Sequence, residues 1–551
     1  MNTTEFLTGL SRKGIQLWVE NGELCFRAPK GTLTPELRTE LSACKAEIIV
    51  WLAPLGKIAS TSFSQERLWF LDQLEPGSTV YNIPIAYRLR GRLDVNALEW
   101  SLQTIVERHD TLRTHFATLA GQPVQVIKPP SKIELHIIDL TSLNSLHREA
   151  VAQEQLDAAA KYYFELDHGS LFCFSLWCLD SEEHILLLNF HHIISDGWSL
   201  DVFHRELQVL YEARLAGKPS PLPPLAKQYS DFAVWQRQWL QGDVLDKQLA
   251  YWKQQLDGSP MVLELPTDRP RPAVQTSRGT TMSFVLPVAL SKALQALSQR
   301  ESVTLYMTLL AAFQVLLHRY TAQTDIVVGA PIANRNQTET EGLIGLLVNT
   351  LALRCDLSGN PSFRKLLGRV REMALGAYSH QDLPFEKLVE ELQPRRSLAH
   401  SPIFQVMFEL QNLPDCRFEL PGLKLEAIQL AGNVARFDLS LVFLEQNGDL
   451  VGHVEYSTDL FDAGTIERMI GHYQTLLENI IVDPNRTLST LLLTIPIEAR
   501  RFSGSTPRPQ PESALPYEKD SQAMRKAVLE ERRAKLSSDK QAMLEKRLRG
   551  Q

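Results

Sequence analysis

The segment EEHILLLNFHHIISDGWSL, residues 182–200, decides the fold of this chain. Residues 184–190 are almost entirely apolar, and a short apolar run bounded by polar residues predicts a buried strand. That strand leads directly into His191 and His192. The two histidines are therefore expected at a strand end, where polar side chains can border a cleft.

The residue types in this segment favour proton transfer over metal binding. Adjacent strand residues point to opposite faces, so His191 and His192 cannot both bind one ion from that backbone, and no third ligand lies nearby. We expect one histidine to be structural and the other to act as a general base, because imidazole titrates near neutral pH. Asp196 is expected to brace the backbone or pair with an arginine, and Gly197 to allow close backbone approach. Two histidines satisfied inside a core are the alternative.

Composition bounds the rest of the chain. Its 551 residues suggest three or four structural units, and 44% hydrophobic with 22% charged residues is typical of globular proteins. A net charge of −7 disfavours nucleic acid as a partner. Six scattered cysteines without a C-x-x-C pair indicate thiols in a reducing compartment. Without a signal peptide or an apolar run of membrane-spanning length, a cytoplasmic location and no membrane contact are expected.

Pattern changes divide the sequence into parts. Residues 1–53 predict a small unit in which a hairpin precedes a helix that Thr34 caps and Pro35 begins. Residues 54–497 alternate strand-like and helix-like segments, which predicts an α/β or α+β architecture. Residues 498–551 are a linker followed by a charged tail that is expected to be helical.

The histidine segment also carries a family resemblance. HHIISDGWS resembles the HHxxxDG signature of condensation domains of nonribosomal peptide synthetases. Six further segments resemble other motifs of that family, in the family's order. They are SFSQERLWFLDQL (62–74), RHDTLRTHF (108–116), YSDFAVWQ (229–236), IGLLVNTLALR (344–354), HQDLPFEKLVEEL (380–392) and SPIFQVMF (401–408).

This resemblance implies a fold and a set of site residues. It implies two lobes similar to chloramphenicol acetyltransferase, at 54–235 and 236–497, arranged as a V around a tunnel that two phosphopantetheine arms enter. His192 is implied as the catalytic histidine, and His191 and Asp196 as mainly architectural. The other implied positions are Arg108 and Arg113 as structural support, and Trp198, Ser199 and Asn349 along the substrate channel. Beside the resemblance, the backbone N–H of Gly197 is a candidate partner for the developing oxyanion.

The first 53 residues resemble a second family. They are similar to the N-terminal docking domains of the TubC type, which begin subunits of peptide synthetases and mixed polyketide assembly lines. The resemblance implies a hairpin whose exposed edge accepts a C-terminal segment of the preceding subunit as an added strand. An upstream synthetase or polyketide synthase subunit is the expected partner.

The implied reaction is amide formation between an upstream carrier-bound acyl or peptidyl thioester and a downstream carrier-bound amine, with L donor and L acceptor favoured. No adenylation loop and no carrier motif are found, so phosphopantetheine is expected on donor and acceptor carrier proteins, with no covalent cofactor and no metal on this chain. A coenzyme A-dependent acyltransferase and an inactive docking scaffold are the alternatives. Both a free-standing protein and a piece of a longer synthetase fit the tail sequence.

Overall fold

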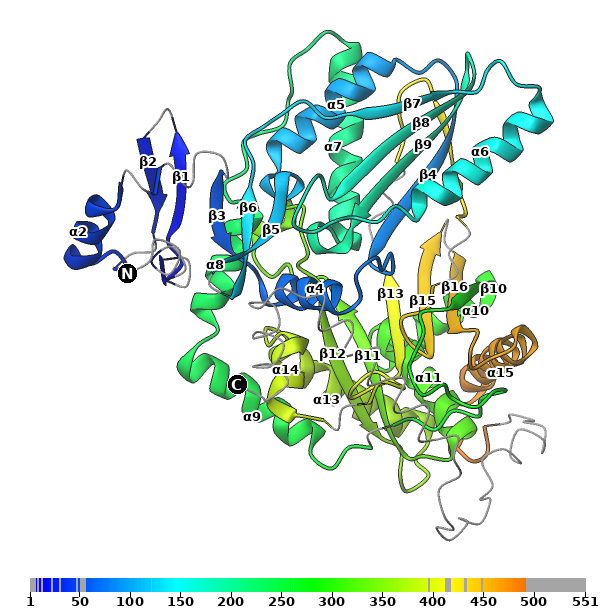
Figure 1. Cartoon of the computed structure of the whole chain (residues 1–551). Coiled ribbons are helices and arrows are strands. Elements are labelled where there is room, and N and C mark those ends of the chain that lie inside the picture. The colour runs from blue at the N-terminus through cyan, green and yellow to red at the C-terminus, as the bar shows by residue number, and fades with distance from the viewer. Residues whose placement is uncertain are drawn as a thin grey trace, which may run out of the picture.

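The computed structural model describes most of residues 6–491 as a small N-terminal unit beside two larger lobes (Figure 1). Residues outside the description are 1–5, 7–8, 11–12, 21–22, 29–30, 46–47, 50–55, 120, 261, 395–396, 412–417, 431–433, 447–448 and 492–551. The expected linker and helical tail at 498–551 therefore lie outside the described residues.

The N-terminal unit has the predicted hairpin and capped helix. Strands β1 (Gln16–Glu20) and β2 (Glu23–Arg27) are antiparallel, and helix α2 (Pro35–Ala43) follows. The Leu37 amide donates to the Thr34 hydroxyl at 3.3 Å, which caps the helix as predicted. A small core holds the unit together, formed mainly by Phe6, Leu10, Ile15, Leu17, Leu37, Leu41 and Ile48.

This unit shares a sheet with the lobe that follows it. Strand β1 pairs with β3 (Lys57–Ser60), where Leu17 lies opposite Ile58. The complete order is β2-β1-β3-β6-β5, with β6 at Gln122–Ile127 and β5 at Thr114–Leu119. The hairpin is thus joined to the lobe through β1, and β2 is left as an edge of the sheet.

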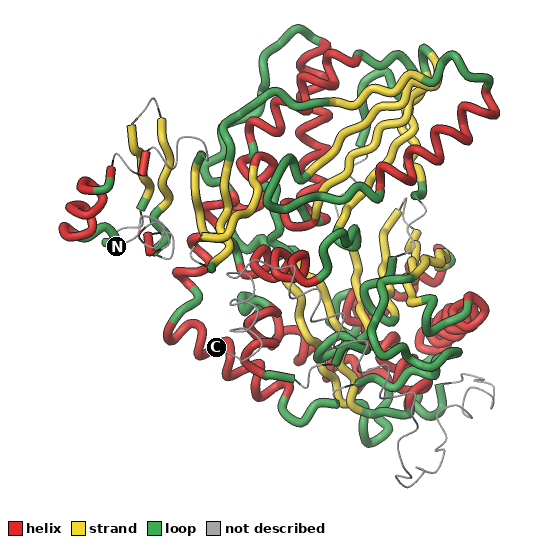
Figure 2. Tube along the Cα trace, in the orientation of Figure 1, coloured by secondary structure: helices red, strands yellow, loops and turns green. Residues whose placement is uncertain are grey.

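The first lobe is built on a sheet ordered β14-β4-β9-β8-β7. Helices pack on both of its faces (Figures 1 and 2). Alternate residues of β9 serve the two faces: Leu186 and Leu188 pack with α5 and α7, whereas Ile185 and Leu187 pack with α6. The continuous apolar run in the sequence follows from this burial on both sides. The elements are α5 (Val95–Arg108), α6 (Ser145–Ala160), α7 (Gly197–Leu215), β4 (Asn82–Arg90), β7 (Leu135–Asp139), β8 (Phe172–Asp180), β9 (Glu183–His191) and β14 (Lys424–Ile428).

The second lobe has a sheet ordered β10-β16-β15-β13-β11-β12, with helices packed against it. Helix α11 (Leu305–Thr321) is buried along nearly its whole length. The other elements are β10 (Gly279–Leu286), β11 (Asp325–Ile332), β12 (Asn349–Asp356), β13 (Val406–Gln411), β15 (Leu439–Gln446), β16 (Asp449–Ser457), α10 (Val288–Arg300), α12 (Thr338–Glu341), α13 (Phe363–Ser379) and α15 (Ala463–Val482).

Several segments connect the lobes. Helices α8 (Tyr229–Trp239) and α9 (Gly242–Leu256) carry the chain from one to the other, so the division expected at residues 235 and 236 falls within α8. Helix α4 (Phe63–Leu74) contacts α14 (Phe385–Leu392) between the lobes. Strand β14 belongs by sequence to the second half of the chain but pairs with β4 of the first lobe.

A search of the described helices for a membrane span finds no single helix long and apolar enough, while α10 and α11 together pass as a pair bent by 105°.

Candidate active site

The backbone at the end of β9 fixes His192. A short 3-10 turn, His192–Ile194, follows the strand, and the His192 amide donates to the Tyr81 carbonyl at 2.8 Å. The ring nitrogen Nδ1 lies 2.8 Å from the Ser195 carbonyl oxygen. Because a carbonyl oxygen only accepts, Nδ1 carries the proton in this contact, and Nε2 keeps its lone pair.

The surroundings keep the His192 ring neutral. Burial, together with the nearby Arg436 cation, lowers its pKa to about 4, and Asp196 opposes the shift. As a residue, His192 is nevertheless half-buried, whereas His191 before it is buried. A neutral imidazole with a free lone pair at neutral pH is the form required of a general base.

His191 has a different environment. It is only 4% exposed, and its Nδ1 accepts a hydrogen bond from the Ile193 amide at 3.1 Å. Burial lowers its pKa to about 3, so it too is neutral at pH 7. The contact with Ile193 shapes the turn that carries His192, which is a structural contribution.

Asp196 joins the two lobes. Its Oδ1 accepts from the Ser199 amide at 2.8 Å, which caps α7, and pairs with Arg335 at 3.0 Å. Its Oδ2 accepts from the amides of Leu347 and Val348 at 2.9 and 3.1 Å. These charged hydrogen bonds hold the pKa of Asp196 below its usual value, although burial alone would raise it.

Arg335 is the partner of Asp196 that the sequence did not identify. Its side chain is 1% exposed and donates to the carbonyls of Thr340 and Leu343 at 2.6 and 2.8 Å. It lies 139 residues from Asp196 in the sequence, so no local spacing could have indicated the pair. An arginine partner was expected, and the structure supplies its position.

Two other predicted residues contribute to this connection between the lobes. The Ser199 hydroxyl donates to Asp196 Oδ1 at 2.6 Å, accepts from the Gly345 amide at 3.0 Å and lies 2.9 Å from the Gly345 carbonyl oxygen. The Trp198 indole donates to the Glu341 carbonyl at 2.9 Å, and the Arg335 cation lies over its ring. In this structure both side chains attach α7 to the second lobe.

The arginines of the RHDTLRT segment lie elsewhere in the first lobe. Arg108 pairs with Glu206 at 2.8 Å, and Arg113 donates to the Val106 carbonyl at 3.1 Å. Neither of these contacts involves Asp196. Both arginines contact residues at or near the end of α5. Their predicted role as structural support stays a hypothesis.

Asn349 makes hydrogen bonds to a neighbouring loop, and Gly197 has open space beside it. The Asn349 amide donates to the carbonyls of Gln381 and Leu383, both at 2.8 Å, and its oxygen accepts from Thr350 and Phe385. The side chain therefore fixes the loop before α14. A Cβ added at Gly197 would meet no described atom within 4 Å, so close packing against the protein does not explain the glycine.

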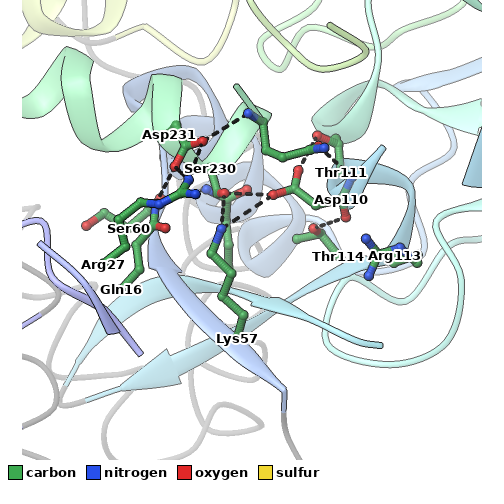
Figure 3. A network of polar contacts seen from close by, with 12 residues as sticks. Gln16, Arg27, Lys57, Ser60, Asp110, Thr111, Arg113, Thr114, Ser230 and Asp231 are labelled. Atoms are coloured by element: carbon green, nitrogen blue, oxygen red, sulfur yellow. Dashed lines mark hydrogen bonds and ion pairs between the residues drawn. The ribbon is translucent and has the colours of Figure 1, made fainter. Parts of the chain in front are cut away.

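A polar network fastens the docking-like hairpin to the first lobe (Figure 3). The Arg27 guanidinium from β2 donates to both oxygens of Asp231 on α8 at 2.9 Å, and Gln16 adds a contact at 3.3 Å. Lys57 donates to Ser230 at 2.8 Å and lies 3.8 Å from Asp110. Burial lowers the pKa of Lys57, and the two aspartates oppose that shift.

Metal-ligand spacing among the described residues occurs away from His192. Among the described residues, the group with metal-ligand spacing comprises Glu165, Asp167 and His168, all exposed. It includes neither His191 nor His192. An exposed group of this kind does not by itself indicate a bound ion.

The structure thus has two sheet lobes joined beside a neutral histidine and a small N-terminal unit, and the family comparisons match both parts. The family model for the condensation domain matches residues 56–502, and that for the TubC N-terminal docking domain matches residues 4–53. The chain belongs to the condensation-domain family, whose members form amide bonds in nonribosomal peptide synthetases. The resemblances drawn from the motifs are thereby confirmed.

Curated relatives are multidomain synthetases. One of the linear gramicidin synthase proteins of Brevibacillus parabrevis is 51% identical over 442 residues, which are 80% of this chain and 6% of that protein. A dimodular nonribosomal peptide synthase of Bacillus subtilis is 41% identical over 451 residues, 79% of this chain and 19% of that protein. The chain thus spans a small fraction of the relatives it matches.

Solved structures confirm the predicted fold class. The X-domain from teicoplanin biosynthesis has a TM-score of 0.71 and 29% identity, covering 79% of this chain and 97% of that chain. SgcC5 from Streptomyces globisporus has a TM-score of 0.64 and 28% identity, covering 78% and 100%. The first condensation domain of the calcium-dependent antibiotic synthetase, at 21% identity and TM-score 0.66 over 79% and 98%, supports the fold alone.

Proposed function

We propose that this chain joins an acyl or peptidyl thioester on a donor carrier protein to an amine on an acceptor carrier protein. The observation that carries the proposal is the neutral ring of the half-buried residue His192, whose Nδ1–H is held by the Ser195 carbonyl. Its Nε2 lone pair can accept a hydrogen bond from the attacking amine and take its proton as the tetrahedral centre forms. Phosphopantetheine belongs to the carriers, and an L donor, an L acceptor and a cytoplasmic location are part of the proposal.

The remaining contribution is positioning. A thioester carbonyl is already electrophilic, so bringing the two tethered ends together removes much of the entropic barrier. The contacts of Asp196 with Arg335, Leu347 and Val348 hold the two lobes at the place where the ends would meet. The open space beside Gly197, at the start of α7, is available to a developing oxyanion near the helix amides.

The test uses the full chain with two separately purified carrier proteins, one loaded with an acyl group and one with an amino acid. We expect His192→Ala to lower amide formation by about 10²-fold or more, the usual contribution of a general base, with an unchanged melting temperature. His168→Ala is the matched control, since its side chain is 76% exposed. Transfer by His192→Ala at the parent rate would refute the proposal.

The same assay separates the alternatives. A coenzyme A-dependent acyltransferase would use a free acyl-coenzyme A as donor in place of the loaded carrier. A docking scaffold would give no product with either donor. The scaffold is kept as an alternative because the similar X-domain has also been solved in complex with OxyB.

We infer that the N-terminal unit receives the C-terminal segment of a preceding synthetase or polyketide synthase subunit along β2. The other strand of the hairpin is already paired with β3, so β2 offers the available edge. Alternate pairs of an antiparallel ladder exchange hydrogen bonds. Counting from Glu20 and Glu23, a pair that stands three residues apart in the sequence, the backbone groups of Leu24 and Phe26 are expected to point outward.

Phe26→Pro tests this edge, because it removes an outward amide while leaving the pairing with β1 available. Phe26→Ala is the control that keeps the amide. We expect Phe26→Pro alone to lower transfer from a carrier attached to the preceding subunit, and neither variant to affect transfer from an isolated carrier. Equal transfer by both variants from the attached carrier would contradict strand addition at β2.

A further inference from the structure

Arg436 reaches from the second lobe to the segment of the first lobe that holds His192. Its Nη2 donates to the Val80 carbonyl at 3.2 Å, and its guanidinium lies 5.2 Å from the centre of the Tyr81 ring. The next carbonyl along the chain, that of Tyr81, accepts the hydrogen bond from the His192 amide. Arg436 thus contacts both Val80 and Tyr81, and Tyr81 is the residue whose carbonyl accepts from the backbone amide of His192.

The backbone of Arg436 is anchored in its own lobe on both sides. Its amide donates to Glu455 Oε1 at 3.3 Å, and its carbonyl accepts from the Gln275 side chain at 3.1 Å. Two residues further on, the carboxylate of Asp438 is 2% exposed and paired with Arg271. A guanidinium carried on such a supported backbone has a defined position, and its contact with Val80 is therefore a second connection between the lobes, separate from that of Asp196.

The charges around His192 give Arg436 a second effect. The ionisable groups that act on the ring are Asp196, which favours protonation, and Arg436, which opposes it. Behind them lie Arg335, paired with Asp196, and Glu455, which partly offsets the charge of Arg436. His191 stands beside the ring as a neutral neighbour.

We propose that Arg436 is a positioning residue for amide formation: it ties the second lobe to Val80 and Tyr81 beside His192 and places a fixed positive charge next to the ring. This inference rests on the proposed function. The positive charge of Arg436 disfavours protonation of His192, so Nε2 stays available to the amine as the pH falls. The proposal adds a residue outside the motif segments to the machinery of the reaction.

The experiment measures amide formation against pH for the full chain with loaded carriers, in the parent, Arg436→Gln, Arg436→Lys and Arg278→Gln. We expect Arg436→Gln to lose activity at a higher pH than the parent. Each unit by which the pKa of His192 rises moves the midpoint of the acid limb up by one pH unit, and burial, which Arg436→Gln leaves in place, continues to hold the pKa below its usual value. Arg436→Lys keeps the charge and is expected to keep the parent's acid limb, whatever it loses in overall rate.

Arg278→Gln is the matched control, since Arg278 is on the same lobe, 75% exposed, and paired with Asp459. It should leave the profile unchanged. An unshifted acid limb in Arg436→Gln would overturn the proposal, as would an equal shift in Arg436→Lys or in Arg278→Gln.

Glu455→Gln is a second control. Burial raises the pKa of the Glu455 carboxyl above its usual value, so this group has largely lost its charge in the pH range where His192 titrates, and the acid limb is expected to stay that of the parent. NMR titration of the His192 ring, assigned by its loss in His192→Ala, should show a higher midpoint in Arg436→Gln than in the parent and in Glu455→Gln. A midpoint in Arg436→Gln equal to that of the parent would overturn the inference even if the rates differ.

The failure of this inference is distinguishable from failure of the proposed function. Transfer by His192→Ala at the parent rate would remove the proposed function itself. Loss of transfer in His192→Ala, together with a parent-like pH profile and titration in Arg436→Gln, would remove only the role of Arg436.

Discussion

Replacing Asp196 by asparagine is expected to weaken the junction between the lobes. The effect should be larger than that of replacing an exposed carboxylate by its amide. The carboxylate accepts five hydrogen bonds: from the Ser199 amide and hydroxyl and from Arg335 on one oxygen, and from the amides of Leu347 and Val348 on the other. An asparagine has one accepting oxygen. In either orientation its NH₂ group therefore faces donors.

The magnitude follows from the burial of the partner. Arg335 is 1% exposed and would keep its positive charge without a counter-ion. Removing one member of a buried ion pair typically costs about 3–5 kcal/mol, and we expect Asp196→Asn to lower the free energy of unfolding by about that amount. Glu301→Gln is the control: its partner Arg364 is 46% exposed and stays solvated when the pair is lost, so this substitution should cost far less.

Urea denaturation followed by tryptophan fluorescence at pH 7 measures both variants. Asp196 has a lowered pKa, so its contribution is complete above the pKa of the unfolded carboxyl and is lost as pH falls through the lower folded value. The difference between parent and variant should therefore be full at pH 7 and shrink in strong acid. A cost below about 1 kcal/mol at pH 7 would refute the reasoning, because the pair would then behave as an exposed one.

Three further predictions concern other parts of the molecule. A Cβ at Gly345 would lie 2.0 Å from Cδ2 of the fully buried Tyr229, so Gly345→Ala should lower the urea midpoint by an amount equivalent to about 1–3 kcal/mol; an unchanged midpoint would contradict the packing. Burial lowers the pKa of His204 to about 4, so the unfolded chain gains a proton at this histidine at a higher pH than the folded chain, and the folded state loses stability as pH falls below about 6.5. His204→Phe should therefore reduce the loss of unfolding free energy between pH 7 and pH 5 by about 2 kcal/mol. An equal loss in parent and variant would show that His204 does not cause it. Asp231→Asn removes the ion pair with Arg27, so hydrogen exchange should speed up in β1 and β2 and stay unchanged in β9; protection equal to the parent throughout would show that the sheet alone holds the hairpin.

Local sequence patterns predicted two kinds of element: those stabilised by residues close in the sequence, and those whose buried residues follow a regular pattern. The apolar run before His191 became β9 because both faces of that strand are covered, and Thr34 capped α2 because an N-cap needs only the next three residues. The motif order then predicted the fold and the family. These predictions needed no knowledge of which distant segments meet.

Contacts between distant segments were the part that the sequence could not supply. Arg335 and Arg436 reach the first lobe from the second, and nothing in their local spacing indicates it. Strand β14, with the short sequence KLEAI, crosses to the first lobe although it lies far along the chain. The motif assigned Asn349 to the channel, which stays a prediction, but it could not indicate the hydrogen bonds of Asn349 with Leu383 and Phe385, because these depend on the position of α14.

The position of His192 depends on both lobes. Within the first lobe, the Tyr81 carbonyl accepts from the His192 backbone amide, and the Ser195 carbonyl accepts from Nδ1 of its ring. The second lobe holds the neighbours of these same residues, through Arg436 on Val80 and through Arg335 on Asp196. Movement between the lobes must therefore strain or release contacts close to His192, because the second lobe binds Val80 and Asp196, the sequence neighbours of the two residues whose carbonyls accept from His192. It follows that substitutions in the loop of residues 343–348 should disturb the His192 ring more than equally destabilising substitutions in the core of either lobe.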